Sequence, residues 1–350
     1  MKIASYLSLL FLMVKSAFAL EPGNYQFYVK QDAELPQFDI KHKVFRMTLP
    51  YQGETQCSIY SPNFETDTLK VNLFFHGIAD NKNSFSFYGK TMASNGVHSM
   101  HCDFPTISVE AYDRALQEKI ALDSIDYESL SSFKKEKFKS DLIAELSEDT
   151  FTQRKLMVDA EFLLEMVKTR AELFRFEGSP EEIFVSGHSL GAFAALLLMG
   201  AHHQEFEHEF DKSSDLQAGI ILSAPTLESH GFHETSFEGV SVPSLSVTGT
   251  NDFLGNQGPN QRFKAWQTFQ KGQKSLLYIQ RMGHFESGMG RNTRAEGKAL
   301  KWDVATHAVV SLFLAEFSSE DISLSHLDFV KAGTAPVQGQ ANPHQLIWKE

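Results

Sequence analysis

Positive charge is scarce in this sequence of 350 residues. Lysine and arginine together number 32 against 44 aspartates and glutamates, so the formal net charge at pH 7 is −12. So acidic a chain repels phosphate backbones, and we therefore expect no nucleic-acid partner. A glycine-rich phosphate-binding motif is also lacking, which disfavours nucleotide chemistry.

Long apolar runs are lacking as well, apart from a short one at the start. Lys2 precedes an apolar stretch, residues 3–14, and Ala17-Phe18-Ala19 then has the small-x-small pattern that signal peptidases require. A dozen apolar residues are too few to span a bilayer comfortably, so we favour a signal peptide over residues 1–19, cut after Ala19, against an uncleaved anchor. Because nothing later is apolar enough for a transmembrane segment, we expect residues 20–350 to be secreted or periplasmic.

Cysteine is nearly absent, with only Cys57 and Cys102. An exported protein can oxidise such a pair to a disulfide, and two buried free thiols are the alternative. The histidines His202, His203 and His208 do not share one helical face, so we expect no metal site.

The hydrophobic pattern alternates between stretches typical of strands and stretches typical of helices. This alternation predicts an α/β fold, a mostly parallel sheet with helices on both faces. The tail, residues 331–350, contains Gly, Pro and Gln and is expected to be irregular and surface-bound. The predicted strands are 43–49, 56–60, 69–76, 97–104, 183–185, 218–222, 244–248 and 276–281.

The segment from about 108 to 147 is charged and predicted to form an insertion of two amphipathic helices. Tyr112 and Leu116 belong to the apolar stripe of the first helix, and Phe138 and Leu142 belong to that of the second. Helical periodicity does not say which surface these stripes cover. A small lid beside a lipophilic cleft and a surface pair without function are both compatible with the pattern.

A Gly-x-Ser-x-Gly motif centred on Ser189 is the strongest functional feature. Gly187 and Gly191 flank the serine, a buried strand is predicted before it, and an apolar helix over 192–199 is predicted after it. A serine on such a tight strand-to-helix turn projects its hydroxyl clear of the backbone, and the glycines let strand and helix approach closely. Ser189 is therefore the candidate nucleophile.

The candidate acid is Asp252, which follows the predicted strand 244–248. Its carboxylate should lie at the carboxyl edge of the sheet, where open α/β sheets place their sites. An ordinary turn aspartate is the alternative, because aspartates are common after strands. Glu228 and Glu234 are less well placed substitutes.

The candidate base is His284, directly after the last predicted strand and preceded by a glycine. His307 falls within a predicted helix and ranks second. The chain order Ser189, Asp252, His284 is the order expected for a triad on a hydrolase sheet.

With these three motifs in order, residues 40 to 317 resemble the α/β-hydrolase superfamily of serine esterases and lipases. The pattern is most similar to secreted lipases and to the platelet-activating-factor acetylhydrolase and dienelactone-hydrolase-like branch. Dienelactone hydrolases proper use a cysteine where this chain has Ser189, which argues against lactone chemistry. Lipases often have a second glycine after the elbow, where this chain has Ala192.

The resemblance implies further features of the site. It implies an oxyanion hole formed by the backbone N–H groups of Ile78 and Leu190, and no cofactor. In such a sheet the strands carrying Cys57 and Cys102 lie side by side, which makes the pair a disulfide candidate.

The implied function is hydrolysis of carboxylic esters through an acyl-enzyme on Ser189, with lipophilic acyl groups favoured by the 30 phenylalanines. The expected ligand is a small-molecule or lipid ester, with transient contact to a lipid surface. An acyltransferase that uses the same acyl-enzyme and a catalytically inactive binding module are the alternatives.

Overall fold

The computed structural model describes residues 23–29, 38–174, 176, 178–269, 274–284, 301–317, 327–331 and 344–348. The predicted signal peptide, residues 1–19, lies outside this set. Within the described residues, every helix is too short or too polar to cross a membrane.

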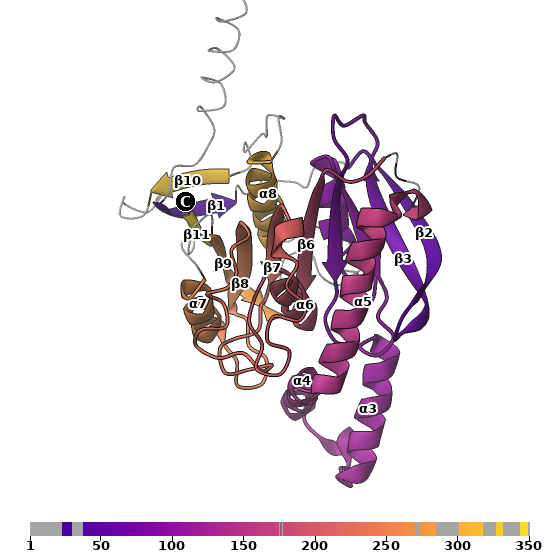
Figure 1. Ribbon diagram of the computed structural model, residues 1–350. Coiled ribbons are helices and arrows are strands. Elements are labelled where there is room, and N and C mark those ends of the chain that lie inside the picture. Colours follow the sequence, from indigo (N-terminus) through magenta and orange to yellow (C-terminus); the bar gives the residue numbers. More distant parts are fainter. Residues whose placement is uncertain are drawn as a thin grey trace, which may run out of the picture.

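One eleven-stranded sheet forms the centre of the molecule (Figure 1). Its order is β10-β1-β11-β9-β8-β7-β6-β4-β5-β3-β2, and neighbouring strands run parallel from β5 to β9. The pairs at both flanks are antiparallel. The strands are β1 (Gly23–Val29), β2 (Ile40–Leu49), β3 (Gly53–Pro62), β4 (Lys70–Phe75), β5 (Val97–Cys102), β6 (Glu182–His188), β7 (Ala218–Leu222), β8 (Ser244–Asn251), β9 (Lys274–Gly283), β10 (Leu327–Lys331) and β11 (His344–Trp348).

Helices cover both faces of the sheet. Residues of α5, α6 and α7 pack into one apolar core, and residues of α2 and α8 pack into a second core on the opposite face. The predicted fold class, an α/β-hydrolase fold with helices on both faces of a mostly parallel sheet, is thereby confirmed. The helices are α2 (Ser86–Ser94), α3 (Val109–Leu122), α4 (Ser132–Ser147), α5 (Thr150–Thr169), α6 (Leu190–Leu198), α7 (Pro259–Gln267) and α8 (Lys301–Ala315).

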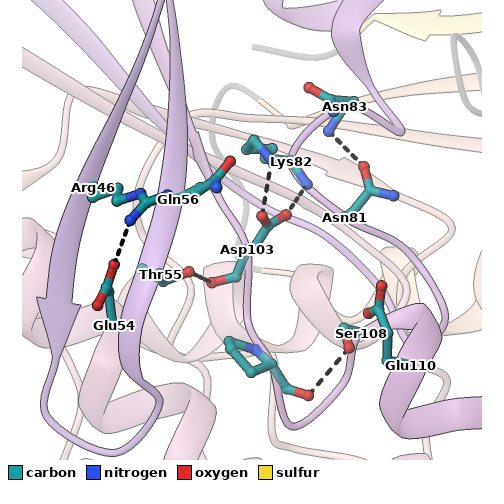
Figure 2. A pocket seen from close by; sticks show the side chains of 11 residues that line it. Arg46, Glu54, Thr55, Gln56, Asn81, Lys82, Asn83, Asp103, Ser108 and Glu110 are labelled. Atoms are coloured by element: carbon teal, nitrogen blue, oxygen red, sulfur yellow. Dashed lines mark hydrogen bonds and ion pairs between the residues drawn. The ribbon is translucent and has the colours of Figure 1, made fainter.

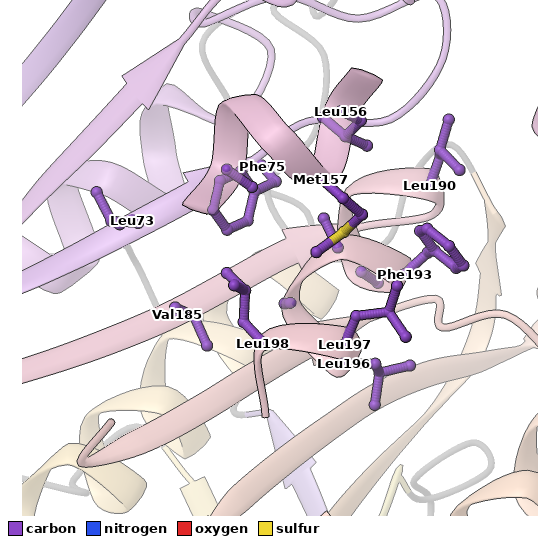
Figure 3. Packing of buried hydrophobic residues seen from close by; sticks show 14 of the residues in the cluster. Leu73, Phe75, Leu156, Met157, Val185, Leu190, Phe193, Leu196, Leu197 and Leu198 are labelled. Atoms are coloured by element: carbon purple, nitrogen blue, oxygen red, sulfur yellow. The ribbon is translucent and has the colours of Figure 1, made fainter. Parts of the chain in front are cut away.

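Helix α6 is the best-buried helix of the first core. All nine of its residues are buried, which explains why its sequence is apolar on every side. Figure 3 shows Phe193, Leu197 and Leu198 of α6 beside Phe75 of β4 and Met157 of α5. The complete burial of α6 fixes the position of its first residue, Leu190, and Ser189 immediately precedes it.

Many of the phenylalanines belong to these cores. Phe75, Phe104 and Phe193 belong to the first core, and Phe184 and Phe313 to the second, each at most 1% exposed. Since these rings pack inside the molecule, the phenylalanine content gives no support to a lipophilic cleft.

Helices α3 and α4 occupy the segment predicted as a helical insertion. Each begins at a serine N-cap, Ser108 for α3 and Ser131 for α4, whose hydroxyl accepts a backbone N–H of the first turn. The buried residues of their apolar stripes, such as Leu116 and Leu142, join the first core. The stripes therefore attach the helical pair to the body of the protein.

The prediction of an irregular tail over residues 331–350 is wrong for β11. This strand pairs with β9 on one side and with β1 on the other, and Leu346 is fully buried. Two segments from opposite ends of the chain thus extend the sheet beyond the predicted range of 40–317. Antiparallel pairing between such distant segments leaves no local pattern in either one.

A disulfide joins β3 to β5. Cys57 and Cys102 face each other in the antiparallel register, with their Cα atoms 4.0 Å apart and a bond between their sulfur atoms. The structure thus brings together the pair that the sequence indicated.

Candidate active site

Ser189 lies on a strained turn between β6 and α6. Its φ of 54° is in the left-handed region, where residues other than glycine are uncommon. A Cβ on Gly187 would overlap the carbonyl of Gly191, and a Cβ on Gly191 would overlap the carbonyl of Phe75. Both glycines are therefore required for the strand and the helix to approach this closely.

His284 directly follows β9, and its imidazole reaches the turn that holds Ser189. Its Nε2 is 2.9 Å from the Ser189 hydroxyl oxygen, and its Nδ1 is 2.8 Å from Oδ1 of Asp252. The three residues are 3%, 6% and 0% exposed in the order His284, Ser189, Asp252, so water does not compete for these contacts. The structure brings together the three side chains that the sequence indicated.

Asp252 is held at the end of β8 by its surroundings. Its backbone N–H donates to the Gly249 carbonyl at 3.1 Å, and its Oδ2 accepts the Thr248 hydroxyl at 2.7 Å. Each oxygen of the carboxylate therefore has a partner, and Oδ1 remains directed at His284.

Arg262 of α7 is a member of the site that the sequence did not indicate. Its Nε lies 3.1 Å from Oδ1 of Asp252, and Nη2 lies 3.3 Å from Nδ1 of His284. Its Nη1 donates to the carbonyls of Ser223 and Ala224, after β7. The arginine side chain is only 3% exposed and links the loops that follow β7, β8 and β9.

The pKa values of the acid and the base are both lowered. Burial alone would raise the pKa of the Asp252 carboxyl, but the charges of Arg262 and His284 outweigh it and hold this pKa below its usual range. Burial lowers the pKa of His284 to about 4; Asp252 opposes that shift, and Arg262 adds to it. The imidazole is therefore neutral at pH 7 and able to accept a proton.

His188, within the elbow motif, also contacts the base. Its Nε2 donates to the backbone carbonyl of His284 at 2.9 Å, while its Nδ1 faces the Asp80 carboxylate at 3.5 Å. The residue between Gly187 and Ser189 thus fixes the backbone that carries the imidazole. The motif gave no indication of this role, because its second position accepts any residue.

Comparison with known families matches residues 66–285 to the FSH1 serine hydrolase model. The chain belongs to the FSH1 serine hydrolase family. A search of curated proteins finds no match. Among solved structures, a dienelactone hydrolase from Anabaena variabilis is similar at 14% identity and a TM-score of 0.46, over 79% of this chain and 98% of that one. The expected resemblance to α/β-hydrolase serine enzymes is confirmed by the family.

The loop after β4 of this FSH1 hydrolase lies against the nucleophile. A Cβ on Gly77 would come within 3.1 Å of the Ser189 Cβ. Leu190 is the first residue of α6, so its N–H has no acceptor within the helix. The N–H groups of Ile78 and Leu190 remain the predicted oxyanion donors.

His76 in the same loop has a structural role in this hydrolase. The Phe104 N–H donates to its Nε2 at 3.0 Å, so Nδ1 carries the proton and donates to the Gly77 carbonyl at 2.8 Å. Both nitrogens are thus occupied in holding the loop, and burial lowers the His76 pKa.

The weaker alternatives lie elsewhere in the hydrolase. His307, the second-ranked base, faces the Thr91 hydroxyl at 3.0 Å through Nδ1. Asp252, rather than Glu228 or Glu234, occupies the position beside Nδ1 of His284. Among the described residues, no group of three or more His, Cys, Asp or Glu side chains is placed to share a metal ion.

A polar pocket of about 520 Å³ is lined in part by Asn81, Lys82 and Asn83, which follow β4 in the chain (Figure 2). Two ion pairs, Lys82 with Asp103 at 3.0 Å and Arg46 with Glu54 at 3.1 Å, occupy its walls. Charged and amide side chains make up most of its lining, and Ser189, Asp252 and His284 are not among the lining residues. Its lining residues are Arg46, Glu54, Thr55, Gln56, Asn81, Lys82, Asn83, Asp103, Pro105, Ser108 and Glu110.

Proposed function

We propose that this FSH1 serine hydrolase cleaves carboxylic esters through an acyl-enzyme on Ser189. The observation that carries the proposal is the unbroken series of contacts from the Ser189 hydroxyl through both nitrogens of His284 to Asp252. A serine hydroxyl is too weak an acid to react by itself at neutral pH, and a neutral imidazole in contact with it supplies the missing base.

Each step of the reaction has a residue to perform it. Nε2 of His284 takes the hydroxyl proton as Oγ of Ser189 bonds to the ester carbonyl carbon, and the imidazolium then gives that proton to the departing alcohol. Water adds to the acyl-enzyme by the same transfer through His284 and releases the acid. Asp252 keeps the proton of the imidazole on Nδ1 throughout.

The negative charge that develops on the carbonyl oxygen requires donors. In this proposal the backbone N–H groups of Ile78 and Leu190 serve as these donors. Loss of one such donor typically costs about two to three orders of magnitude in rate.

We propose further that the protein is exported. The disulfide between Cys57 and Cys102 supports an oxidising location, such as a periplasm or the extracellular space. Alkylation of the denatured, unreduced protein from its native compartment tests this proposal. Two reactive thiols would contradict it, and none would support it.

Labelling with a fluorophosphonate tests the proposed nucleophile. We expect covalent attachment to Ser189, no labelling of Ser189→Ala, and labelling of His284→Ala slowed by about 10³-fold or more. A Ser186→Ala variant is the matched control, because that serine lies in β6 with its hydroxyl bonded to Asn72. Labelling of Ser189→Ala at the wild-type rate would contradict the proposal.

A series of p-nitrophenyl esters then tests the reaction and defines the acyl group. Turnover that disappears in Ser189→Ala would establish ester hydrolysis. Labelled but non-hydrolysing protein would instead indicate transfer of the acyl group to another acceptor, which added glycerol or sterol would reveal as a new ester.

A further inference from the structure

Arg262 stands in an unusual position for a cation. It contacts the acid and the base of the triad together, at 3.1 Å from Oδ1 of Asp252 and 3.3 Å from Nδ1 of His284. The same carboxylate oxygen that holds Nδ1 of His284 is therefore shared with a guanidinium. A guanidinium remains charged at all physiological pH values.

The shared oxygen changes how strongly the acid supports the base. A lone carboxylate beside an imidazole stabilises the imidazolium by its full negative charge. Here Arg262 neutralises part of that charge and places its own positive charge beside Nδ1. Both effects disfavour the protonated form of His284, and burial strengthens them because the site has little water to screen them.

Several described groups face His284. Among them are Asp252 after β8, Arg262 on α7, the Ser189 hydroxyl and the His188 ring, whose centroid is 5.1 Å away. Asp80 faces the far side of His188, and buried His230 lies further along the site. Asp252 is thus an anion in direct contact with His284, and Arg262 is the ion-pair partner of Asp252.

We propose that Arg262 is a positioning residue that keeps His284 unprotonated, so that the hydrolase retains a working base in acidic surroundings. This inference rests on the proposed function of Ser189 and His284. The guanidinium is held in place beside Nδ1 of His284, because its Nη1 donates to the Ser223 and Ala224 carbonyls of the neighbouring loop.

The sign of the expected pH effect follows directly. His284 accepts the Ser189 proton only when neutral, so reactivity is lost as the pH falls through the pKa of His284. A cation at Nδ1 lowers that pKa and carries reactivity to lower pH. Removal of the cation raises the pKa and moves the acid limb of the pH profile upward.

The experiment measures the rate constant of fluorophosphonate labelling against pH for the full-length protein and two variants. Arg262→Met keeps the unbranched stem of the side chain without the charged guanidinium, and Arg262→Lys keeps the charge. We expect the acid midpoint of the wild type well below the ordinary histidine value of about 6.5. We expect Arg262→Met to raise it by about one pH unit or more, and Arg262→Lys to stay near the wild type.

A purely structural role for Arg262 would lower the labelling rate at every pH without moving the midpoint, and that result would overturn the proposal. Equal midpoints for the Met and Lys variants would also overturn it. If Arg262→Met does not fold, Arg262→Gln, whose polar amide is uncharged and reaches about as far as Nε of the arginine, takes its place. A wild-type midpoint at or above about 6.5 overturns the proposal without any variant. Absence of labelling at all pH values would instead reject the proposed nucleophile.

Discussion

The two sides of His284 are built by different physical means. On the nucleophile side, close backbone packing of β6, α6 and β4 sets the geometry, and Gly187 and Gly191 permit it. On the acid side, charges set it, because Asp252 is placed by an ion pair and hydrogen bonds to Arg262, Thr248 and His284.

The difference concerns how each side responds to change. The closely packed backbone leaves no room for an added atom, so a substitution on the nucleophile side should lower the free energy of unfolding. A network of charged side chains can lose one member and keep its shape. A substitution on the acid side should therefore lower the reaction rate while the fold is retained. Three substitutions separate these responses.

Asp252→Asn should have the largest effect, on the acid side. An amide cannot keep the proton on Nδ1 of His284, and we expect the rate of ester hydrolysis to fall by about 10³- to 10⁴-fold with the fold retained. The measurement is kcat for a p-nitrophenyl ester together with a urea unfolding curve. Glu228→Gln is the control and should hydrolyse at the wild-type rate; a drop there and none for Asp252→Asn would place the acid on the other loop.

Gly191→Ala should have the next largest effect, on the nucleophile side. The added methyl group would overlap the Phe75 carbonyl, and backbone cannot move aside cheaply, so we expect a loss of about 3 kcal/mol in the free energy of unfolding. Urea denaturation measures this loss.

Gly178→Ala is the matched control for that substitution. Gly178 has a φ of 97° but no described atom within 4 Å of an added Cβ, so only the backbone strain of about 1–2 kcal/mol applies. Equal losses for the two variants would mean that close packing does not determine the elbow.

His188→Leu should have the smallest effect of the three. His188 belongs to the elbow on the nucleophile side and bonds the backbone of His284. The substitution removes the donor to the His284 carbonyl, and we expect kcat to fall by about tenfold as the imidazole loses part of its alignment. His188→Gln restores a donor of similar reach and should recover much of the rate. Identical rates for Leu and Gln would show that the hydrogen bond has no part in catalysis.

Much of the fold could be predicted because its strands and helices are visible as local hydrophobic patterns in the sequence. The strands from β4 to β9 are short apolar runs, and α6 is apolar on every side because it is buried on every side. Strands β1 and β11 escaped prediction, since their pairing joins residues more than 300 positions apart. The number of phenylalanines could not predict a lipophilic cleft, because composition does not distinguish core from cleft.

By itself, the sequence indicated Ser189, His284 and Asp252 as candidate nucleophile, base and acid, together with their order along the chain. These residues stand at strand ends, and strand ends are visible in hydrophobic periodicity. Only the tertiary structure decided that Arg262 would contact both Asp252 and His284, and that His188 would donate to the His284 carbonyl. An arginine inside an ordinary amphipathic helix has no local feature that marks it as buried, and its partners become apparent only once β8, β9 and α7 are packed together.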